Sequence, residues 1–330
     1  MTVLYIDGAC GSPRFDQSLQ LARDDPSIVS LVFVSAQICD VAADQIVQLL
    51  CLGGDKQRNW QSILLSNCSG DGVDTVIAAA LQVVHDFEIR GAKGVTPEHS
   101  LAIQQGLQRT ATLTKLCFSI TSSLDEESCR LISEGLRDNR SLTALHFSCC
   151  KVFPPVTSSF IDLLSSGKET IQSLRLDSCR LEDCQLRDVF ETLQTFQNLQ
   201  HLSFPYNRCE SLGYQALALL LQSPTCRIQE LDCSRQHVNT IHGEYLDGVF
   251  DSIPSSLTRL NLSYCPLNDQ QVCSLHNCGL YTVNRCLLSS SVSLFLFSSM
   301  YISILFYADE KDCILSTEYS IIKRIVPLWL

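Results

Sequence analysis

A single eleven-residue pattern recurs along this chain with a nearly constant period. In the copy that begins at Ile171, positions one, four, six and eleven are apolar and position nine is a cysteine; we call these positions slots 1 to 11. Slots 1, 4 and 6 are apolar in every copy, counting cysteine as apolar, although only 45% of the chain is apolar. A fixed period of this kind predicts a solenoid, in which each unit packs against its neighbours. The copies begin at Met1, Ile28, Trp60, Val84, Leu113, Leu142, Ile171, Leu199, Ile228 and Leu257.

The spacing between copies divides the chain into regions. From Val84 onward, successive starts differ in residue number by 29, 29, 29, 28, 29 and 29, whereas upstream they differ by 27, 32 and 24. We predict one solenoid domain of about ten repeats over residues 1–267, most regular over 113–267, and an aberrant C-terminal tail over 268–330. A solenoid grows along one axis, so 330 residues do not require several separate cores.

Each copy predicts one strand followed by one helix. Slots 4 and 6 alternate with slots 3, 5 and 7, as in a strand with one buried face. In segments such as 124–140 and 182–198, apolar residues recur every three or four positions, a pattern typical of an amphipathic helix. Parallel strands lie about 4.8 Å apart and helices about 10 Å apart, so the helices must fan outward. We expect an α/β horseshoe with a parallel sheet on the concave face and helices on the convex face.

Two helix starts carry capping signals. Thr96 followed by Pro97 predicts an N-cap and a proline at the first helical position. Ser123 with Glu126 predicts a capping box, in which each side chain binds the backbone N–H of the other residue.

The eleven-residue pattern resembles the leucine-rich repeat. Its 28–29-residue period, with Cys or Asn at slot 9, is similar to the ribonuclease-inhibitor subtype, and segment 124–142 (LDEESCRLISEGLRDNRSL) is similar to the helical half of repeats in NOD-like receptors. The resemblance implies a curved solenoid that exposes a broad concave wall, as a scaffold or as part of a larger receptor. Slot 9 is alanine at Ala9, Ala36 and Ala92, and alanine cannot bond the turn backbone, so we expect less regular N-terminal turns.

The net charge and the cysteine content of the chain bear on its partners and on its cellular compartment. The net charge is −11 and no basic stripe is present, which disfavours a nucleic-acid partner. Several of the 18 cysteines fall at repeat slots, where they serve as small apolar residues or weak donors. The N-terminus lacks the basic region and apolar run of a signal peptide. We therefore predict a cytoplasmic protein with free thiols.

The tail contains an uncharged segment, 286–308, long enough to span a bilayer but diluted by seven serines. Three interpretations remain open: a degenerate last repeat, a membrane anchor, or a tail foreign to the natural protein. We favour a repeat-like or aberrant tail over the anchor.

No motif predicts catalysis, a metal site or a cofactor. Cys273, His276 and Cys278 lie close together, but zinc sites usually pair two such spacings and no second one is nearby. Cys149 and His146 are a possible nucleophile–base pair, but the sequence supports it only weakly, because side chains at slots 8 and 5 do not obviously face each other.

The concave wall is the predicted functional surface. Strands stacked in register place slots 3, 5 and 7 in columns, and nothing structural requires charged side chains there. We predict a non-catalytic protein–protein interaction scaffold or ligand-sensing module. The alternatives are a GTPase-activating regulator resembling Ran GTPase-activating proteins and a membrane-anchored repeat protein. The candidate partner-binding residues are Lys115, His146, Arg175, Asp177, His201, Tyr206, Glu230, Asp232 and Arg259.

Overall fold

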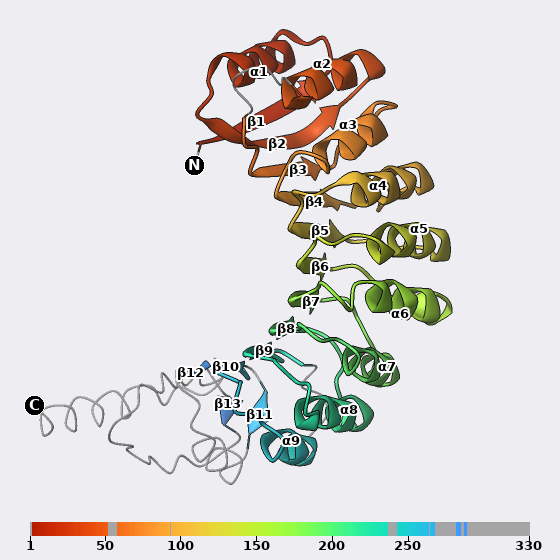
Figure 1. The fold of residues 1–330 in the computed structure, drawn as a ribbon, viewed down its shortest axis with the longest axis vertical. Helices are drawn as coiled ribbons and strands as arrows, with labels where there is room; N and C mark the ends of the chain where they lie inside the picture. Colours follow the sequence, from red (N-terminus) through yellow and green to blue (C-terminus); the bar gives the residue numbers. More distant parts are fainter. Residues whose placement is uncertain are drawn as a thin grey trace, which may run out of the picture.

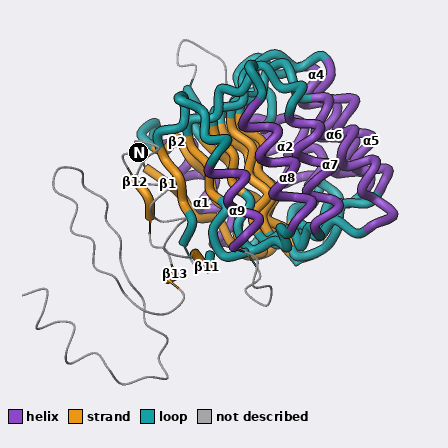
Figure 2. Tube along the Cα trace, turned by 90° about the horizontal axis from the view of Figure 1, so that it is seen from below, coloured by secondary structure: helices purple, strands orange, loops and turns teal. Residues whose placement is uncertain are grey.

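The computed structural model describes residues 2–51, 58–92, 94–236, 243–263, 265–267, 282–284 and 287–288. Strands and helices alternate along a curved stack, with the strands on the inner side and the helices on the outer side (Figure 1). Viewed along the stack, the strands form one layer and the helices another (Figure 2). The predicted α/β horseshoe is confirmed.

The sheet has eleven parallel strands that follow one another in chain order. They are β1 (Thr2–Ala9), β2 (Ile28–Gln37), β3 (Ser62–Ser66), β4 (Asp86–Gly91), β5 (Lys115–Ile120), β6 (Ala144–Ser148), β7 (Ser173–Asp177), β8 (His201–Ser203), β9 (Glu230–Asp232), β10 (Arg259–Asn261) and β12 (Thr282–Asn284). A second, two-stranded sheet pairs β11 (Pro266–Leu267) with β13 (Leu287–Leu288).

One helix follows each of the first nine strands. They are α1 (Pro13–Asp24), α2 (Asp40–Cys51), α3 (Val73–Ala80), α4 (Pro97–Arg109), α5 (Glu126–Arg137), α6 (Thr157–Ser166), α7 (Asp183–Leu193), α8 (Ser211–Gln222) and α9 (Gly243–Phe250), with a 3-10 turn, η1 (Pro154–Val156), before α6. Thr96 caps α4 as predicted, accepting a hydrogen bond from the His99 N–H at 3.3 Å. The capping box predicted for α5 is wrong: Asp125 caps that helix, accepting from the Ser128 N–H at 2.7 Å.

The core occupies the space between sheet and helices, as the slots predict. Slots 4 and 6 are buried in every copy except at Leu4, which is half-buried. Slot 1 is buried in every copy from Ile28 to Leu257. The pairing register joins equal slots, so that His146 pairs with Arg175 and Ser203 with Asp232. Slots 3, 5 and 7 therefore form columns on the concave wall.

Where slot 9 carries a cysteine or an amide, its side chain can link a turn to the preceding copy. The Cys179 thiol donates to the Phe147 carbonyl at 3.5 Å, and the Asn207 amide donates to the Leu176 carbonyl at 2.8 Å. Both acceptors occupy slot 6 of the preceding copy. Asn207 Oδ1 also accepts from the Leu181 N–H at 3.0 Å, so the amide satisfies a backbone donor as well as backbone carbonyls. Cys68, Gln236 and Cys265 donate to slot 6 of the preceding copy in the same way.

Slot 8 carries a backbone requirement that the sequence pattern did not reveal. The residue there has a left-handed conformation in most copies, although several different side chains occupy it. Non-glycine residues adopt this conformation at a cost of about 1 kcal/mol, so the tight turn after each strand imposes it. The residues are Gly8, Ser35, Asn67, Cys149, Ser178, Tyr206 and Arg235. In the first copy, where slot 9 is alanine, the β1–β2 pairing also shifts register between Asp7 and Ala9.

Little of the predicted tail is described. Strand β12 pairs with β10, which extends the sheet beyond residue 267. Leu287–Leu288 form β13, and the rest of segment 286–308, like Cys273, His276 and Cys278, lies outside the described residues. No helix within the described part of the chain has the length and apolar character needed to cross a membrane.

Candidate binding surface

A hollow of about 410 Å³ lies on the concave wall over strands β6 to β10. It forms because the side chains of slots 3 and 5 in these neighbouring strands surround it, with leucines from slot 4 at its base. Six of the nine predicted site residues line it: His146, Arg175, His201, Glu230, Asp232 and Arg259. We call this the concave hollow.

Glu230 joins the charges on one side of the concave hollow. Its carboxylate lies 3.2 Å from His201 Nδ1 and 2.6 Å from Arg259 Nη1. All three side chains are substantially exposed, from 38% for Glu230 to 69% for Arg259. Exposed ion pairs contribute at most about 1 kcal/mol to stability, so the fold depends little on these residues.

Arg175 is held in place by a carboxylate beside it. Arg175 Nη2 lies 2.5 Å from Asp177 Oδ2, and the Ser203 hydroxyl donates to Asp177 Oδ1 at 2.9 Å. Burial raises the pKa of the Asp177 carboxyl, while the charge and hydrogen bond of Arg175 act in the opposite direction. Asp177 does not line the concave hollow, but it orients a guanidinium that is half exposed there.

His146 is a neutral histidine at the edge of this charged region. Its Nε2 lies 3.2 Å from the Ser173 hydroxyl. Burial lowers the pKa of His146 to about 4, with smaller contributions from the positive charges of Lys115 and Arg175. At neutral pH the ring is therefore a hydrogen-bonding group without charge. Lys115 itself lies on β5 and does not line the concave hollow.

Asp232 lines the concave hollow, whereas Tyr206 lies outside it. Asp232 lines the concave hollow and accepts hydrogen bonds from the Asn261 amide at 2.9 Å and the Ser234 hydroxyl at 2.6 Å. Tyr206 lies in the turn after β8, outside the lining residues, where the Arg235 guanidinium packs 5.1 Å from its ring centre and donates to its hydroxyl. The structure thus brings six of the predicted residues together and sets Lys115, Asp177 and Tyr206 around them.

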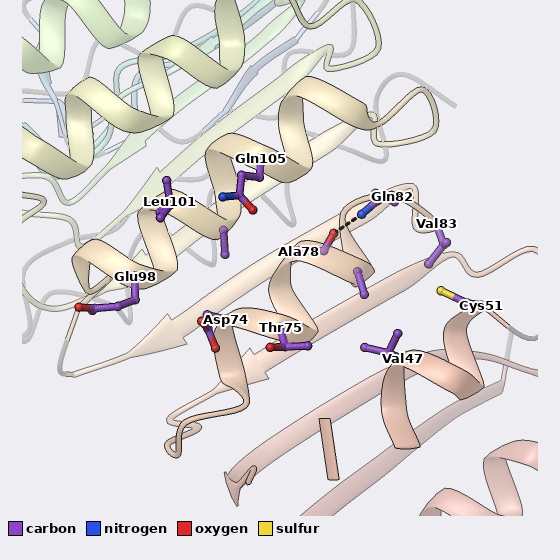
Figure 3. A pocket seen from close by; sticks show the side chains of 12 residues that line it. Val47, Cys51, Asp74, Thr75, Ala78, Gln82, Val83, Glu98, Leu101 and Gln105 are labelled. Atoms are coloured by element: carbon purple, nitrogen blue, oxygen red, sulfur yellow. Dashed lines mark hydrogen bonds between the residues drawn. The ribbon is translucent and has the colours of Figure 1, made fainter. Parts of the chain in front are cut away.

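A second hollow, of about 500 Å³, lies on the convex side between α2, α3 and α4 (Figure 3). Small residues such as Ala78 and Ala102 leave this space between adjacent helices. Asp74 and Glu98 are its charged lining residues, and no ion pair joins the side chains that line it in the described structure. This hollow therefore has less of the converging polar chemistry that recognition sites use.

An apolar surface on the first strands was not predicted as a site. Val3, Tyr5 and Val34 on β1 and β2 are 42%, 67% and 37% exposed. The register places Tyr5 beside Val32, which in turn pairs with Leu64, so these side chains share one part of the concave wall. The signal was present in the sequence, because slot 5 is apolar in the second and third copies, where a solvated wall would be polar.

The repeated strand, turn and helix, with cysteine or amide ladders at slot 9, define a leucine-rich-repeat protein. The chain is distantly related to the leucine-rich-repeat regions of NACHT, LRR and PYD domains-containing proteins and to ribonuclease inhibitor. It is 31% identical to protein 5 of the first group from Bos taurus over 147 residues, which are 44% of this chain and 13% of the relative. It is 28% identical to protein 4E from Mus musculus over 218 residues, 66% of this chain and 21% of the relative.

The ribonuclease inhibitor of Sus scrofa is 31% identical over 96 residues, 29% of this chain and 21% of the relative. The chain thus spans about a fifth or less of the length of these curated relatives. An internalin from Listeria monocytogenes superposes with a TM-score of 0.42 at 13% identity, over 81% of this chain and 74% of the internalin. No protein-family model matches the chain.

Proposed function

We propose that this chain is a non-catalytic protein-binding domain whose partner occupies the concave hollow. The observation that carries the proposal is the convergence of exposed charged side chains from neighbouring strands on one hollow. The burial of slots 1, 4 and 6 accounts for the fold without them. One relative is named as an inhibitor of ribonuclease, itself a protein, and this supports a protein partner.

The chemistry of the wall suits a protein surface. Arg175 and Arg259 are exposed guanidiniums, and arginine is enriched among the residues that dominate binding energies. Their carboxylate partners hold them in fixed positions, which reduces the entropy lost on binding. A mixed pattern of both charges favours a partner with the complementary pattern, because like charges placed together are costly.

Two other interpretations have less support than this one. A GTPase-activating role is the alternative from a different class, and no observation among the described residues favours it. The membrane-anchored form depends on segment 286–308, almost all of which lies outside the described residues. Cytoplasmic localisation remains part of the proposal, supported by the free thiols of the described cysteines.

The test begins with capture of partners from native extract, identification by mass spectrometry, and calorimetry with the purified partner. Alanine at Arg175, His201 or Asp232 is expected to weaken binding by about 1 kcal/mol or more each, roughly fivefold to tenfold in Kd. The melting temperature of these variants should stay close to that of the wild type, because surface substitutions change stability little.

The matched control is on the convex face. Glu191→Ala and Gln194→Ala alter exposed residues at the end of α7 and should leave the Kd unchanged. Glu182 is less suitable, because it caps α7 and pairs with Arg208 at 2.9 Å. If the convex variants lose binding and the concave variants keep it, the recognition surface lies on the helices and the proposal is wrong.

A further inference from the structure

A smaller hollow, of about 210 Å³, lies where strands β3 and β4 end and the chain turns toward α3 and α4. Its apolar lining comes from both layers of the solenoid, with Leu65 and Ile89 from the strands and Val73 and Ile77 from α3. None of these four residues is more than 8% exposed. The hollow shares no lining residue with the concave hollow, so the two sites are separate. We call it the turn cavity.

The turn cavity forms in a copy of the repeat that lacks the side chains found at this place in other copies. In the seventh copy, Cys179 at slot 9 and Leu181 at slot 11 are both fully buried. In the fourth copy the same slots hold Ala92 and Gly94, and both residues line the turn cavity. The Cys179 thiol donates to the slot 6 carbonyl of the preceding copy, whereas the Ala92 side chain has no donor for the corresponding carbonyl, that of Leu65.

The backbone keeps slot 11 of this copy small. Gly94 has a φ of +80°, in the left-handed region, and a Cβ added there would clash with Ser122 Oγ. Only glycine fits this turn without strain. Ala92, by contrast, is exposed and does not adopt a left-handed conformation, so slot 9 can accept a larger side chain.

Two polar side chains of the lining have donor groups that remain available. Asn67 Oδ1 accepts from the Ala92 N–H at 3.2 Å, and the amide N–H groups of Asn67 have no acceptor among the described residues. His99 Nδ1 accepts from the Thr96 N–H at 3.4 Å, so the neutral ring carries its proton on Nε2. An apolar lining with a few available polar groups is typical of small-molecule sites.

The surroundings of the turn cavity favour an uncharged ligand. Burial lowers the pKa of His99, against the charges of Asp74 and Glu98, so the ring is neutral at pH 7. These two carboxylates would also repel an anion placed beside the ring. Arg90 is in the lining, but its guanidinium is paired with Glu88 at 2.9 Å. A bound molecule therefore gains most from an apolar body and an uncharged oxygen that accepts a hydrogen bond.

We propose that the turn cavity binds a free, neutral small molecule with an apolar ring and one oxygen atom, as in phenol. The oxygen accepts a hydrogen bond from Asn67 or His99, and the ring lies against the apolar lining. A cavity of about 150 Å³ holds a benzene molecule, so 210 Å³ is enough for a ring with one substituent. The inference does not depend on which protein partner binds the concave hollow.

The first experiment titrates phenol into the isotopically labelled full chain and follows the backbone amides by NMR. We expect saturable shifts centred on the amides of Ala92, Gly94 and His99. Benzene should bind about fivefold more weakly than phenol, because it lacks the oxygen that accepts the hydrogen bond. Benzoate should also bind more weakly than phenol, because it is an anion.

A second ligand separates a free molecule from a polypeptide side chain. N-acetyl-tyrosinamide carries the same phenol ring on a peptide backbone. It should bind no more tightly than phenol, because the turn cavity has room for the ring alone. Tighter binding of this compound would mean that the cavity receives a side chain of a protein, and it would overturn the proposal of a free small molecule.

The variant Ala92→Asn closes the turn cavity from within. It introduces the side chain that Asn207 has at slot 9, where the amide is fully buried and donates to the slot 6 carbonyl of the preceding copy at 2.8 Å. Phenol binding should fall by at least about tenfold, while the melting temperature should not fall. Ala111→Asn makes the same change at an exposed alanine outside the lining, and it should bind phenol as the wild type does.

The proposal is overturned if the phenol shifts do not saturate or are centred elsewhere. It is also overturned if benzene or benzoate binds as tightly as phenol, or if Ala92→Asn keeps the wild-type affinity. The location of the shifts and the comparison of ligands are measured on the wild-type protein, so misfolding of a variant would not remove the test.

Discussion

The concave wall has two chemically different halves built on the same strand register. On β1 to β3 it exposes Val3, Tyr5 and Val34, with few charges between them. On β6 to β10 it exposes paired charges around the concave hollow, such as Glu230 with Arg259. Equal slots pair with one another in both halves, so the geometry of the backbone does not explain the contrast.

The comparison shows that stability and recognition depend on different slots. Slot 4 is buried equally at Ile63 in the first half and Leu174 in the second, each 1% exposed. The wall slots beside them are free to change, because they contribute little to the core. The halves do differ at slot 9: the first half has Ala9 and Ala36 there and a hydrogen-bonded residue only at Cys68, whereas in the second half consecutive copies carry hydrogen-bonded residues such as Cys179 and Asn207.

The largest expected effect tests whether the two halves share one core. Ile63→Asp and Leu174→Asp should each lower the free energy of unfolding by at least about 3 kcal/mol, because each removes buried apolar contacts and buries a carboxylate. Urea denaturation followed by circular dichroism measures both. A loss confined to one variant would show that the two halves are not equivalent in their packing.

The adjacent wall residues provide the controls for that experiment. Leu64→Gln and Arg175→Gln should each cost less than about 1 kcal/mol. Glutamine is used at Arg175 because aspartate would lie against the carboxylate of Asp177. A wall variant as unstable as its core neighbour would mean that the strand register in that half is wrong.

A smaller effect tests the slot 9 hydrogen bonds, which run through consecutive copies from Cys179 to Cys265 in the second half. Asn207→Ala should lower stability by about 2 kcal/mol, because it leaves the buried Leu176 carbonyl and Leu181 N–H without their side-chain partner. Asn207→Cys should lose less, since Cys179 shows that a thiol at slot 9 can donate to the corresponding carbonyl. Equal losses in the two variants would remove the hydrogen bond as the explanation.

The smallest effect is a pH dependence specific to the second half. The pKa of His146 is about 4 in the folded protein and about 6.5 when unfolded, so the unfolded state binds more protons between these values. Stability should therefore fall as pH drops through this window, by up to about 2 kcal/mol after allowance for partial exposure. Strands β1 to β3 contain no histidine. His146→Gln should reduce this loss, measured by urea denaturation at about pH 7.5, 5.5 and 4.5; an unchanged slope would show that the ring is not protected from protonation.

The fold could be predicted because one pattern specifies it repeatedly. The burial of slots 1, 4 and 6, the pairing of equal slots and the parallel sheet all follow from the regular period of that pattern. Local choices were harder to predict. Asp125 and Ser123 are both residue types that cap helices well, so the pattern did not show which of them precedes the helix. Helix α5 begins at Glu126, and Asp125 is therefore its cap.

For the candidate site, sequence analysis predicted which surface holds it but not the contacts between its side chains. Slot positions predicted that His146, Arg175 and Asp232 share the wall, because register fixes the columns. They did not predict that Glu230 contacts both His201 and Arg259, since long side chains choose partners by rotamer. Tyr206 was predicted as a partner-binding residue, but it occupies slot 8, in the left-handed turn, where its ring packs against Arg235.

Because equal slots pair across neighbouring strands, two numbers locate any residue on the concave wall. The slot gives a residue's height across the wall, and the copy number gives its place along the curve. The copy that begins at Ile171 is one residue shorter than its neighbours, yet β7 and β8 still pair slot for slot, so a helix or loop absorbs the difference. A one-residue insertion in a helix or loop between strands would therefore leave a bound partner's contacts in place. A one-residue insertion inside a strand would instead reverse the alternation, so that every following wall residue of that strand would face the core.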